Sequence, residues 1–273
     1  MSEDRAEAAE RAHARLMRVM DVGQLFPSAP PRELMAEYDL PADAWDHLTR
    51  RPQRKYLSRR RNIRRAWNRV QVFLPELMGG PAQDVLELST AHGAVLEVLR
   101  HFGHRVTGND YANFVAAGEG RTLLRAPGEA ITGRAVDDYG IPLGPDGAPA
   151  DWPYRPIIES IGIPMKIFDC GRLPWPVADK SFDVVLSLQA IEHYCHPSGW
   201  DEIVAEMCRV ARRTVVVLLN PLRPDLAQDA DYARAFETAR LRLRDWDRDG
   251  FRCIGCHIAW GQALGFKLMR LAS

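Results

Sequence analysis

The sequence has few features of a secreted, membrane-spanning or nucleic-acid-binding protein. Its five cysteines are an odd number without the spacing of a disulfide framework, which indicates reduced thiols. No run approaches the ~18 consecutive apolar residues that a bilayer span requires, and residues 1–15 are charged, without the apolar core of a signal peptide. The 36 basic and 36 acidic residues cancel, so the whole molecule has no general attraction for nucleic acid or anionic lipid. We therefore expect a cytoplasmic protein without a membrane span.

The composition is that of a globular protein with a substantial core. Of the 273 residues, 46% are hydrophobic, and the length allows one large α/β domain with additions or two small domains. We expect a helical extension over residues 1–80 and the main domain over residues 81–273. Short helices are predicted within the extension at Ala8–Met20, Pro31–Tyr38 and Asp43–Leu48.

The charge changes sharply within this extension. Residues 1–49 contain ten acidic and five basic residues, whereas Arg50–Arg69 contains ten basic residues and no acidic one. One interpretation is a solvated basic face that pairs with the acidic segment before it. The other is a binding site for a phosphorylated, carboxylated or nucleic-acid substrate. Aromatic residues are sparse in this stretch, so nucleic acid is the less favoured partner.

Residues 84–113 have the pattern of a strand, a tight turn, a helix and a second strand. The apolar run at Val85–Leu88 suits a buried parallel strand, and Ala94–Leu99 has an apolar helical face. A second strand, Arg105–Gly108, would place Asp110 at its carboxyl end. This geometry puts a ligand at the start of the helix and a carboxylate within reach of a ribose.

The chain after Asp110 is less regular and then regains strand patterns. Residues 114–153 are rich in glycine and proline and too long for a plain connection, so they predict either a mobile surface hairpin or a lid or binding loop. Tyr154–Ile161 would be the crossover helix. Further strands are expected at Lys166–Phe168, Phe182–Leu188 and Thr214–Leu219, with helices ending near Val210 and spanning Asp229–Trp246.

These residues resemble the class I S-adenosylmethionine-dependent methyltransferases, of the small-molecule type. The first motif of that family corresponds to Glu87–Gly93, although Ser89 and Ala91 stand where glycines are usual. Leu173–Pro176 followed by Ser181–Val185 is similar to a later motif, and Gln189–His193 matches the segment after the fourth strand. The matching order covers Asp84–Pro221, about half of the chain. The resemblance implies a doubly wound, mainly parallel sheet with the Rossmann-like order 3-2-1-4-5.

The resemblance also implies a binding site for S-adenosyl-L-methionine. Asp110 would hold the ribose hydroxyls, Tyr111 would cover one face of the adenine, and Asp169 with the Cys170 backbone would face its amino edge. The turn would lie along the homocysteine part, and Tyr56, Arg60 or Arg64 of the basic segment is a candidate for its carboxylate. The cofactor-binding residues expected on this basis are Glu87, Ser89, Thr90, Ala91, His92, Gly93, Asp110, Tyr111, Asp169, Cys170 and Gln189.

His193 is the candidate catalytic base, because imidazole titrates near neutral pH and the matching family position borders the acceptor. The competing interpretation is that Glu192 and His193 orient the loop after the strand. We expect methyl transfer to an oxygen or nitrogen of a small metabolite or glycan-type acceptor, for which the basic segment favours an anionic molecule. The alternatives are an RNA methyltransferase, based on Arg50–Arg69, and a non-catalytic binding or scaffold protein, based on Ser89 and Ala91.

Two features of the C-terminal part remain open. Cys253–His257 has the C-x-x-C-H spacing of a haem attachment site, but we expect neither haem nor metal there. Phe266–Leu271 is expected to be the sixth strand, after a helix ending over Ala259–Gly265. The sequence shows no clear antiparallel seventh strand of the kind the family usually has. Either that strand is missing, or Phe251–Ile258 is misassigned.

Overall fold

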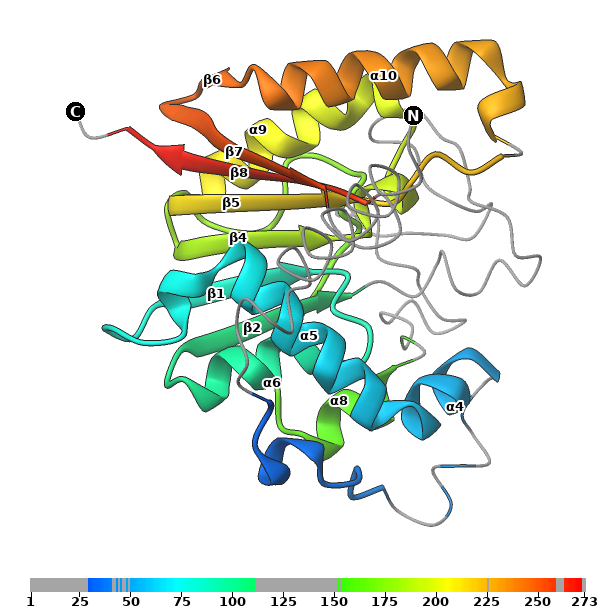
Figure 1. Cartoon of the computed structure of the whole chain (residues 1–273), viewed down its shortest axis with the longest axis vertical. Helices are drawn as coiled ribbons and strands as arrows, with labels where there is room; N and C mark the ends of the chain where they lie inside the picture. Colours follow the sequence, from blue (N-terminus) through cyan, green and yellow to red (C-terminus); the bar gives the residue numbers. More distant parts are fainter. Residues whose placement is uncertain are drawn as a thin grey trace, which may run out of the picture.

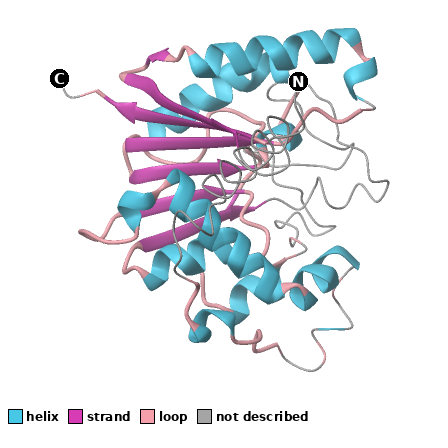
Figure 2. Ribbon diagram, viewed as in Figure 1, coloured by secondary structure: helices cyan, strands magenta, loops and turns pink. Residues whose placement is uncertain are grey.

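The molecule is built on a twisted sheet with helices on both faces (Figures 1 and 2). The computed structural model describes residues 29–40, 43, 45, 48, 50–110, 152, 154–224, 226–258 and 263–271. Its strands are β1 Asp84–Leu88, β2 Arg105–Asp110, β3 Met165–Ile167, β4 Phe182–Leu188, β5 Ala211–Leu219, β6 Asp247–Arg248, β7 Phe251–Ile258 and β8 Leu264–Arg270. They form one sheet of order β3-β2-β1-β4-β5-β8-β7-β6, in which β1 to β5 are parallel and β8 is antiparallel to β5.

The helices fall into two layers because successive side chains of a strand point to opposite faces. Along β5, Val216 and Leu218 pack in one apolar cluster with α5, α6 and α8, whereas Val215 and Val217 pack in the other with α9 and α10. Figure 1 shows these groups of helices on either side of the sheet. The helical elements are η1 Arg32–Met35, α4 Arg50–Leu57, α5 Arg59–Phe73, η2 Pro75–Leu77, α6 Ala94–His101, α8 Arg155–Ser160, η3 Ile191–His193, η4 Pro197–Gly199, α9 Trp200–Val210, η5 Leu226–Gln228 and α10 Ala230–Arg244.

The predicted fold class and the order of the first five strands are confirmed. Strand β4 has the predicted bounds, and α8 forms the predicted crossover between β2 and β3. The helix predicted at Pro31–Tyr38 is a single 3₁₀ turn, η1. The helix predicted at Ala8–Met20 lies outside the described residues, and so do half of Asp43–Leu48 and most of the insertion at 114–153.

The strand predicted at Phe266–Leu271 is present as β8, but its expected place as the sixth strand was wrong, and the alternative that Phe251–Ile258 was misassigned is confirmed. β8, which contains Phe266, is antiparallel to β5 and so takes the place of the family's seventh strand. β7 pairs antiparallel with β8 and takes the place of the sixth. The helix end predicted at Ala259–Gly265 was also wrong for Leu264 and Gly265, which belong to β8. The apolar residues of β7 do not mark a buried strand face, because Ile254 and Ile258 are 55% and 80% exposed.

The N-terminal extension is fixed to the sheet layer by a buried ion pair. Both guanidinium Nη atoms of Arg59 on α5 lie 2.7 Å from the two carboxylate oxygens of Glu97 on α6. Arg59 also donates to the carbonyl oxygens of Leu34 and Ala36, and its guanidinium lies 4.1 Å from the centroid of the Tyr38 ring. Both charged side chains are almost fully buried, so α5 is an integral part of the core.

Within the described ranges, none of the helices has the length and apolar character needed to cross a membrane.

Replacing Arg59 by leucine should destabilise the protein by about 3–5 kcal/mol, because it leaves the buried Glu97 carboxylate without its partner. Chemical denaturation followed by circular dichroism measures this change. The matched control is Arg155→Leu, which removes an exposed pair with Glu159 and should cost less than about 1 kcal/mol. Equal losses in the two variants would contradict the role assigned to the buried pair.

Candidate active site

Two cavities lie at the carboxyl ends of the parallel strands. The first, which we call the loop cavity, has a volume of about 250 Å³ and lies between the turn after β1, the end of β4, and helices α4 and α5. The second, the apolar cavity, has a volume of about 390 Å³ and lies between the loop after β5, η5 and α10. His193 and Asn220 line both cavities, so the two spaces meet at these residues.

The turn after β1 has an unusual backbone. Ser89, Ala91 and Gly93 all have positive φ angles, of 52°, 51° and 75°. The left-handed conformation suits glycine, and it costs other residues roughly 1–2 kcal/mol each. The turn therefore has the conformation of a glycine-rich loop even where the sequence supplies serine and alanine.

Hydrogen bonds hold this strained turn against β2. Thr90 donates through Oγ1 to the Glu87 carbonyl (2.8 Å) and accepts from the Asn109 backbone N–H (3.2 Å). The backbone N–H of Ala91 donates to the Asp110 carboxylate (3.1 Å). Asp110 thus orders the turn from the neighbouring strand end.

Asn109 joins the ends of three strands. Its side-chain nitrogen donates to the carbonyls of Lys166 and Phe168, both at 3.0 Å, and its oxygen accepts from the backbone N–H of Ser89 (3.3 Å). The thiol of Cys170 donates to the same oxygen (2.9 Å). Since Asn109 is completely buried, these bonds fix the turn relative to β2 and to the chain beyond β3.

An acidic and a basic side chain both line the loop cavity. Glu87, at the end of β1, is buried, and its Oε2 atom has no hydrogen-bond partner. Burial raises the pKa of Glu87 to about 8, a rise that Asp110 reinforces and the nearby Arg69 opposes. Arg69 extends from α5 into the same cavity, where its Nε atom is buried without a partner. The cavity therefore presents one acidic and one basic group with unused hydrogen-bonding capacity.

His92 adds no positive charge to this cavity. Burial, together with Lys55 and Arg69, lowers its pKa to about 3. The ring is neutral at physiological pH, and its Nδ1 accepts from the backbone N–H of Ala94 (3.3 Å). Lys55 and Arg69 are therefore the cationic side chains among the described residues that line the loop cavity.

A chain of side-chain hydrogen bonds leads from the loop cavity to the apolar cavity. Arg69 donates to the side-chain oxygen of Gln189, and the Gln189 nitrogen donates to the side-chain oxygen of Asn220 (2.9 Å). Asn220 in turn donates from its backbone nitrogen and its Nδ2 to the two carboxylate oxygens of Glu192. Gln189 has a φ of 59°, so this contact also depends on a left-handed residue.

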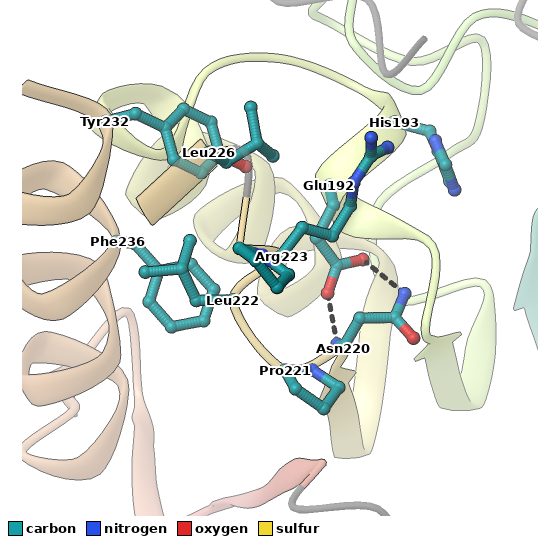
Figure 3. A pocket seen from close by; sticks show the side chains of 10 residues that line it. Glu192, His193, Asn220, Pro221, Leu222, Arg223, Leu226, Tyr232 and Phe236 are labelled. Atoms are coloured by element: carbon teal, nitrogen blue, oxygen red, sulfur yellow. Dashed lines mark hydrogen bonds between the residues drawn. The ribbon is translucent and has the colours of Figure 1, made fainter. Parts of the chain in front are cut away.

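Three polar side chains of the apolar cavity, Glu192, His193 and Asn220, lie at the junction with the loop cavity, and Arg223 and Tyr232 also line it. Figure 3 shows Glu192 and Asn220 bonded to each other on one side, and Phe236, Leu222, Leu226 and Tyr232 on the other. Burial raises the pKa of Glu192 to about 7 against the hydrogen bonds from Asn220. Because both of its oxygens accept from Asn220, Glu192 links η3 to the loop after β5.

The sequence-predicted residues divide into two groups in the structure. Those that line the loop cavity are Glu87, Ser89, Thr90, Ala91, His92, Gln189 and His193. Gly93, Asp110, Asp169 and Cys170 lie behind or beside it, on the turn and at the ends of β2 and β3. Asp169 accepts from the backbone N–H of Gly171 (2.8 Å). Tyr111 lies outside the described residues.

Sequence reasoning missed four residues that shape the site, namely Lys55, Arg69, Asn109 and Asn220. Arg60 and Arg64, the arginines proposed for the cofactor carboxylate, lie instead on the exposed face of α5. Tyr56 packs against Tyr38, with ring centroids 5.4 Å apart. The missed signal was helical spacing: Arg69 lies three residues after the buried Ala66 and therefore belongs to the inner side of α5.

Comparison with known proteins found one matching family model. Residues 157–219 match the family model described as a methyltransferase domain. The sequence from 157 to 219 is thus that of a methyltransferase domain. The matched segment of this methyltransferase domain runs from α8 through β3, β4 and α9 to the end of β5. The search of curated proteins found no match.

Several solved structures are similar to the methyltransferase domain. The magnesium protoporphyrin IX methyltransferase from Synechocystis, with bound S-adenosylhomocysteine, is 14% identical; the match covers 78% of this chain and 87% of that chain, with a TM-score of 0.45. The 1,6-didemethyltoxoflavin-N1-methyltransferase from Burkholderia thailandensis is 13% identical, with 77% and 79% covered and a TM-score of 0.41. A methyltransferase from Corynebacterium glutamicum is 12% identical, with 77% and 97% covered and a TM-score of 0.42.

Replacing Ala91 by glycine should stabilise the protein by about 0.5–1 kcal/mol. The relief of the left-handed strain, about 1–2 kcal/mol, exceeds the roughly 0.5–1 kcal/mol that the added backbone entropy of glycine costs. Thermal and chemical unfolding measure the effect. The control Ala205→Gly, within α9, should instead destabilise by about 0.5–1 kcal/mol. A loss of stability in both variants would show that the turn is not strained at Ala91.

Proposed function

We propose that the methyltransferase domain transfers a methyl group from S-adenosylmethionine in the loop cavity to an oxygen or nitrogen of a small metabolite in the apolar cavity. One observation carries this proposal: His193 and Asn220 line both cavities, so a donor in one and an acceptor in the other would meet beside them. Methyl transfer requires mainly that a nucleophile be aligned with the methyl carbon, and adjoining sites supply that alignment.

The loop cavity fits the amino-acid end of the cofactor. The unpartnered Glu87 oxygen is suited to an ammonium group, and Arg69 and Lys55 are suited to a carboxylate. The backbone of Ser89–Gly93, with its left-handed residues, would run along this part of the molecule. When bound, the cofactor supplies a methyl group on a positively charged sulfur, which a lone pair of the acceptor attacks.

The remainder of the cofactor would follow the ends of β2 and β3. Asp110 would accept hydrogen bonds from the ribose, and Asp169 with the Cys170 backbone would face the adenine edge. Both carboxylates already accept a backbone N–H, from Ala91 and Gly171, which holds them in place. Tyr111 would cover one face of the adenine.

His193 is the proposed general base. It follows β4 in η3, its backbone N–H donates to the Ala190 carbonyl (2.8 Å), and it lines both cavities. An acceptor hydroxyl there would lose its proton to the imidazole as the carbon–oxygen bond forms. Glu192 is less suited to this role, because both of its carboxylate oxygens accept from Asn220.

The affinity for S-adenosylhomocysteine should rise with pH between about 6 and 8, by at most about tenfold per pH unit. The sign follows from Glu87: burial raises its pKa to about 8, so in this range the free protein carries a proton that must leave before the carboxylate can bind an ammonium. Calorimetric titration in buffers of different ionisation enthalpy measures both the affinity and the proton released.

In Glu87→Gln the affinity should be lower and its rise with pH should disappear. Glu192→Gln is the control, because Glu192 also titrates near neutrality but does not line the loop cavity, so in this variant the affinity should still rise with pH.

A second pair of variants compares the inner and outer sides of α5. Arg69→Gln should weaken binding of S-adenosylhomocysteine about tenfold or more, and Arg60→Gln should leave the affinity unchanged. Full affinity in Glu87→Gln and Arg69→Gln would refute the proposed donor site.

Methyl transfer itself is tested with methyl-labelled S-adenosylmethionine and a panel of hydroxyl- and amine-bearing metabolites. His193→Gln should keep its affinity for S-adenosylhomocysteine within about threefold but transfer methyl to a hydroxyl about 10²–10⁴ times more slowly. His196→Gln is the control, since that histidine bonds Ser198 and lines neither cavity. Labelling of RNA alone would favour the RNA alternative, and tight binding without any labelled product would favour the non-catalytic one.

A further inference from the structure

We propose that the apolar cavity selects an acceptor with a compact apolar body, such as one or two aromatic rings, and excludes sugars. This inference rests on the proposed function, because it takes the apolar cavity as the acceptor site. It narrows the range of acceptors from metabolites and glycans to ring-bearing molecules that carry one hydroxyl or amine at one end.

The walls of the cavity away from the loop cavity are apolar. Leu222 and Leu226 are half-buried and Tyr232 and Phe236 are fully buried, and Figure 3 shows these four side chains on the side opposite Glu192 and Asn220. Aromatic and aliphatic walls stabilise a flat apolar ligand through contact area and ring packing. The side chains of Leu222, Leu226 and Phe236 offer a ligand hydroxyl no hydrogen-bond partner, and the hydroxyl of Tyr232 is the polar atom among these four described side chains.

The polar groups of the lining are concentrated where the reaction would take place. His193 and Asn220 lie at the junction of the cavities, and Glu192 is held there by its bonds to Asn220. Arg223 also lines the cavity, and its side chain is exposed. An acceptor with a single polar end could place that end at the junction and its apolar body between the leucines and aromatic rings.

A sugar does not match this distribution. Its hydroxyl groups surround the ring, so several would be buried against Leu222, Leu226 and Phe236 without partners. Each such group costs roughly 1–3 kcal/mol, which exceeds the stabilisation that its few apolar atoms would gain.

The volume of the apolar cavity also favours a compact acceptor. That volume, about 390 Å³, lies near the lower end of the usual range for ligand pockets, about 300–1,000 Å³. One or two rings fill such a space. A macrocycle or an oligosaccharide would extend well beyond the described walls.

The experiment compares naphthol with methyl glucoside as probes of the wild-type chain, with and without saturating S-adenosylhomocysteine. Naphthol, followed by its own fluorescence, should bind at least about tenfold more tightly than methyl glucoside, followed by calorimetry. Leu226→Asp should weaken naphthol binding about tenfold or more, because it places a charge in the apolar wall. The matched control is Leu241→Asp, on the exposed surface of α10 and outside the cavity, which should change the affinity less than about twofold.

A second variant keeps the test valid if Leu226→Asp does not fold. Leu226→Trp keeps the wall apolar but fills the space, so it should also abolish naphthol binding while S-adenosylhomocysteine still binds. Comparable binding of the two probes, or naphthol binding that neither Leu226 variant weakens, would overturn the inference.

The outcomes separate this inference from the proposed function. Naphthol binding that depends on Leu226 but is accompanied by no S-adenosylhomocysteine binding would refute the donor site and leave the apolar selectivity standing. Normal S-adenosylhomocysteine binding with a preference for methyl glucoside would do the reverse.

Discussion

Convergence of parallel strand ends is the constraint on which the rest of the site depends, and the buried amide of Asn109 maintains it. That one side chain bonds the turn after β1 and two carbonyls along and just beyond β3, so three loops share one fixed reference point. A buried amide that loses its partners costs about 1–3 kcal/mol for each group left unsatisfied. The left-handed turn at Ser89 and Ala91 persists because these bonds, together with the bond from Ala91 to Asp110, hold it in place.

The charges of the site follow from its position between helix and sheet. Glu87 points to the face of the sheet covered by α5, and the low dielectric there keeps its pKa high even though Arg69 lies nearby. The same arginine bonds Gln189, which continues through Asn220 to Glu192 at the edge of the apolar cavity. Both cavities therefore share one polar framework, whereas their remaining walls differ in character, one carrying charges and the other apolar.

Much of the fold could be predicted from the sequence because the central strands carry strong signals. The apolar runs of β1, β4 and β5 are buried on both faces, and β4 has the predicted bounds. The last two strands could not be ordered from the sequence, because apolar residues of β7 such as Ile254 and Ile258 are exposed and do not mark its buried face. Hydrophobic periodicity describes a single segment, and it does not specify which strand that segment pairs with in the sheet.

The site was predictable where its residues follow the strands and unpredictable where they come from elsewhere in the chain. Glu87, the turn after it, Gln189 and His193 lie at strand ends, and the structure places them around the loop cavity. Lys55 and Arg69 come from helices, and in a stretch of ten basic residues only the position on the inner side of α5 distinguishes Arg69 from Arg60 and Arg64. That distinction depends on how α5 packs on the sheet, which the sequence does not state.

The buried pair between Arg59 and Glu97 has a consequence for the order in which the chain acquires structure during synthesis. The two residues are 38 positions apart, and the arginine leaves the ribosome first. At about 5–20 residues per second, α5 has to wait several seconds before α6 can supply the carboxylate that allows its guanidinium to be buried. The N-terminal helices can form early, but they cannot settle onto a core until β1 and α6 have been made. The helix that carries Arg59 is thus completed by a helix that is synthesised after it.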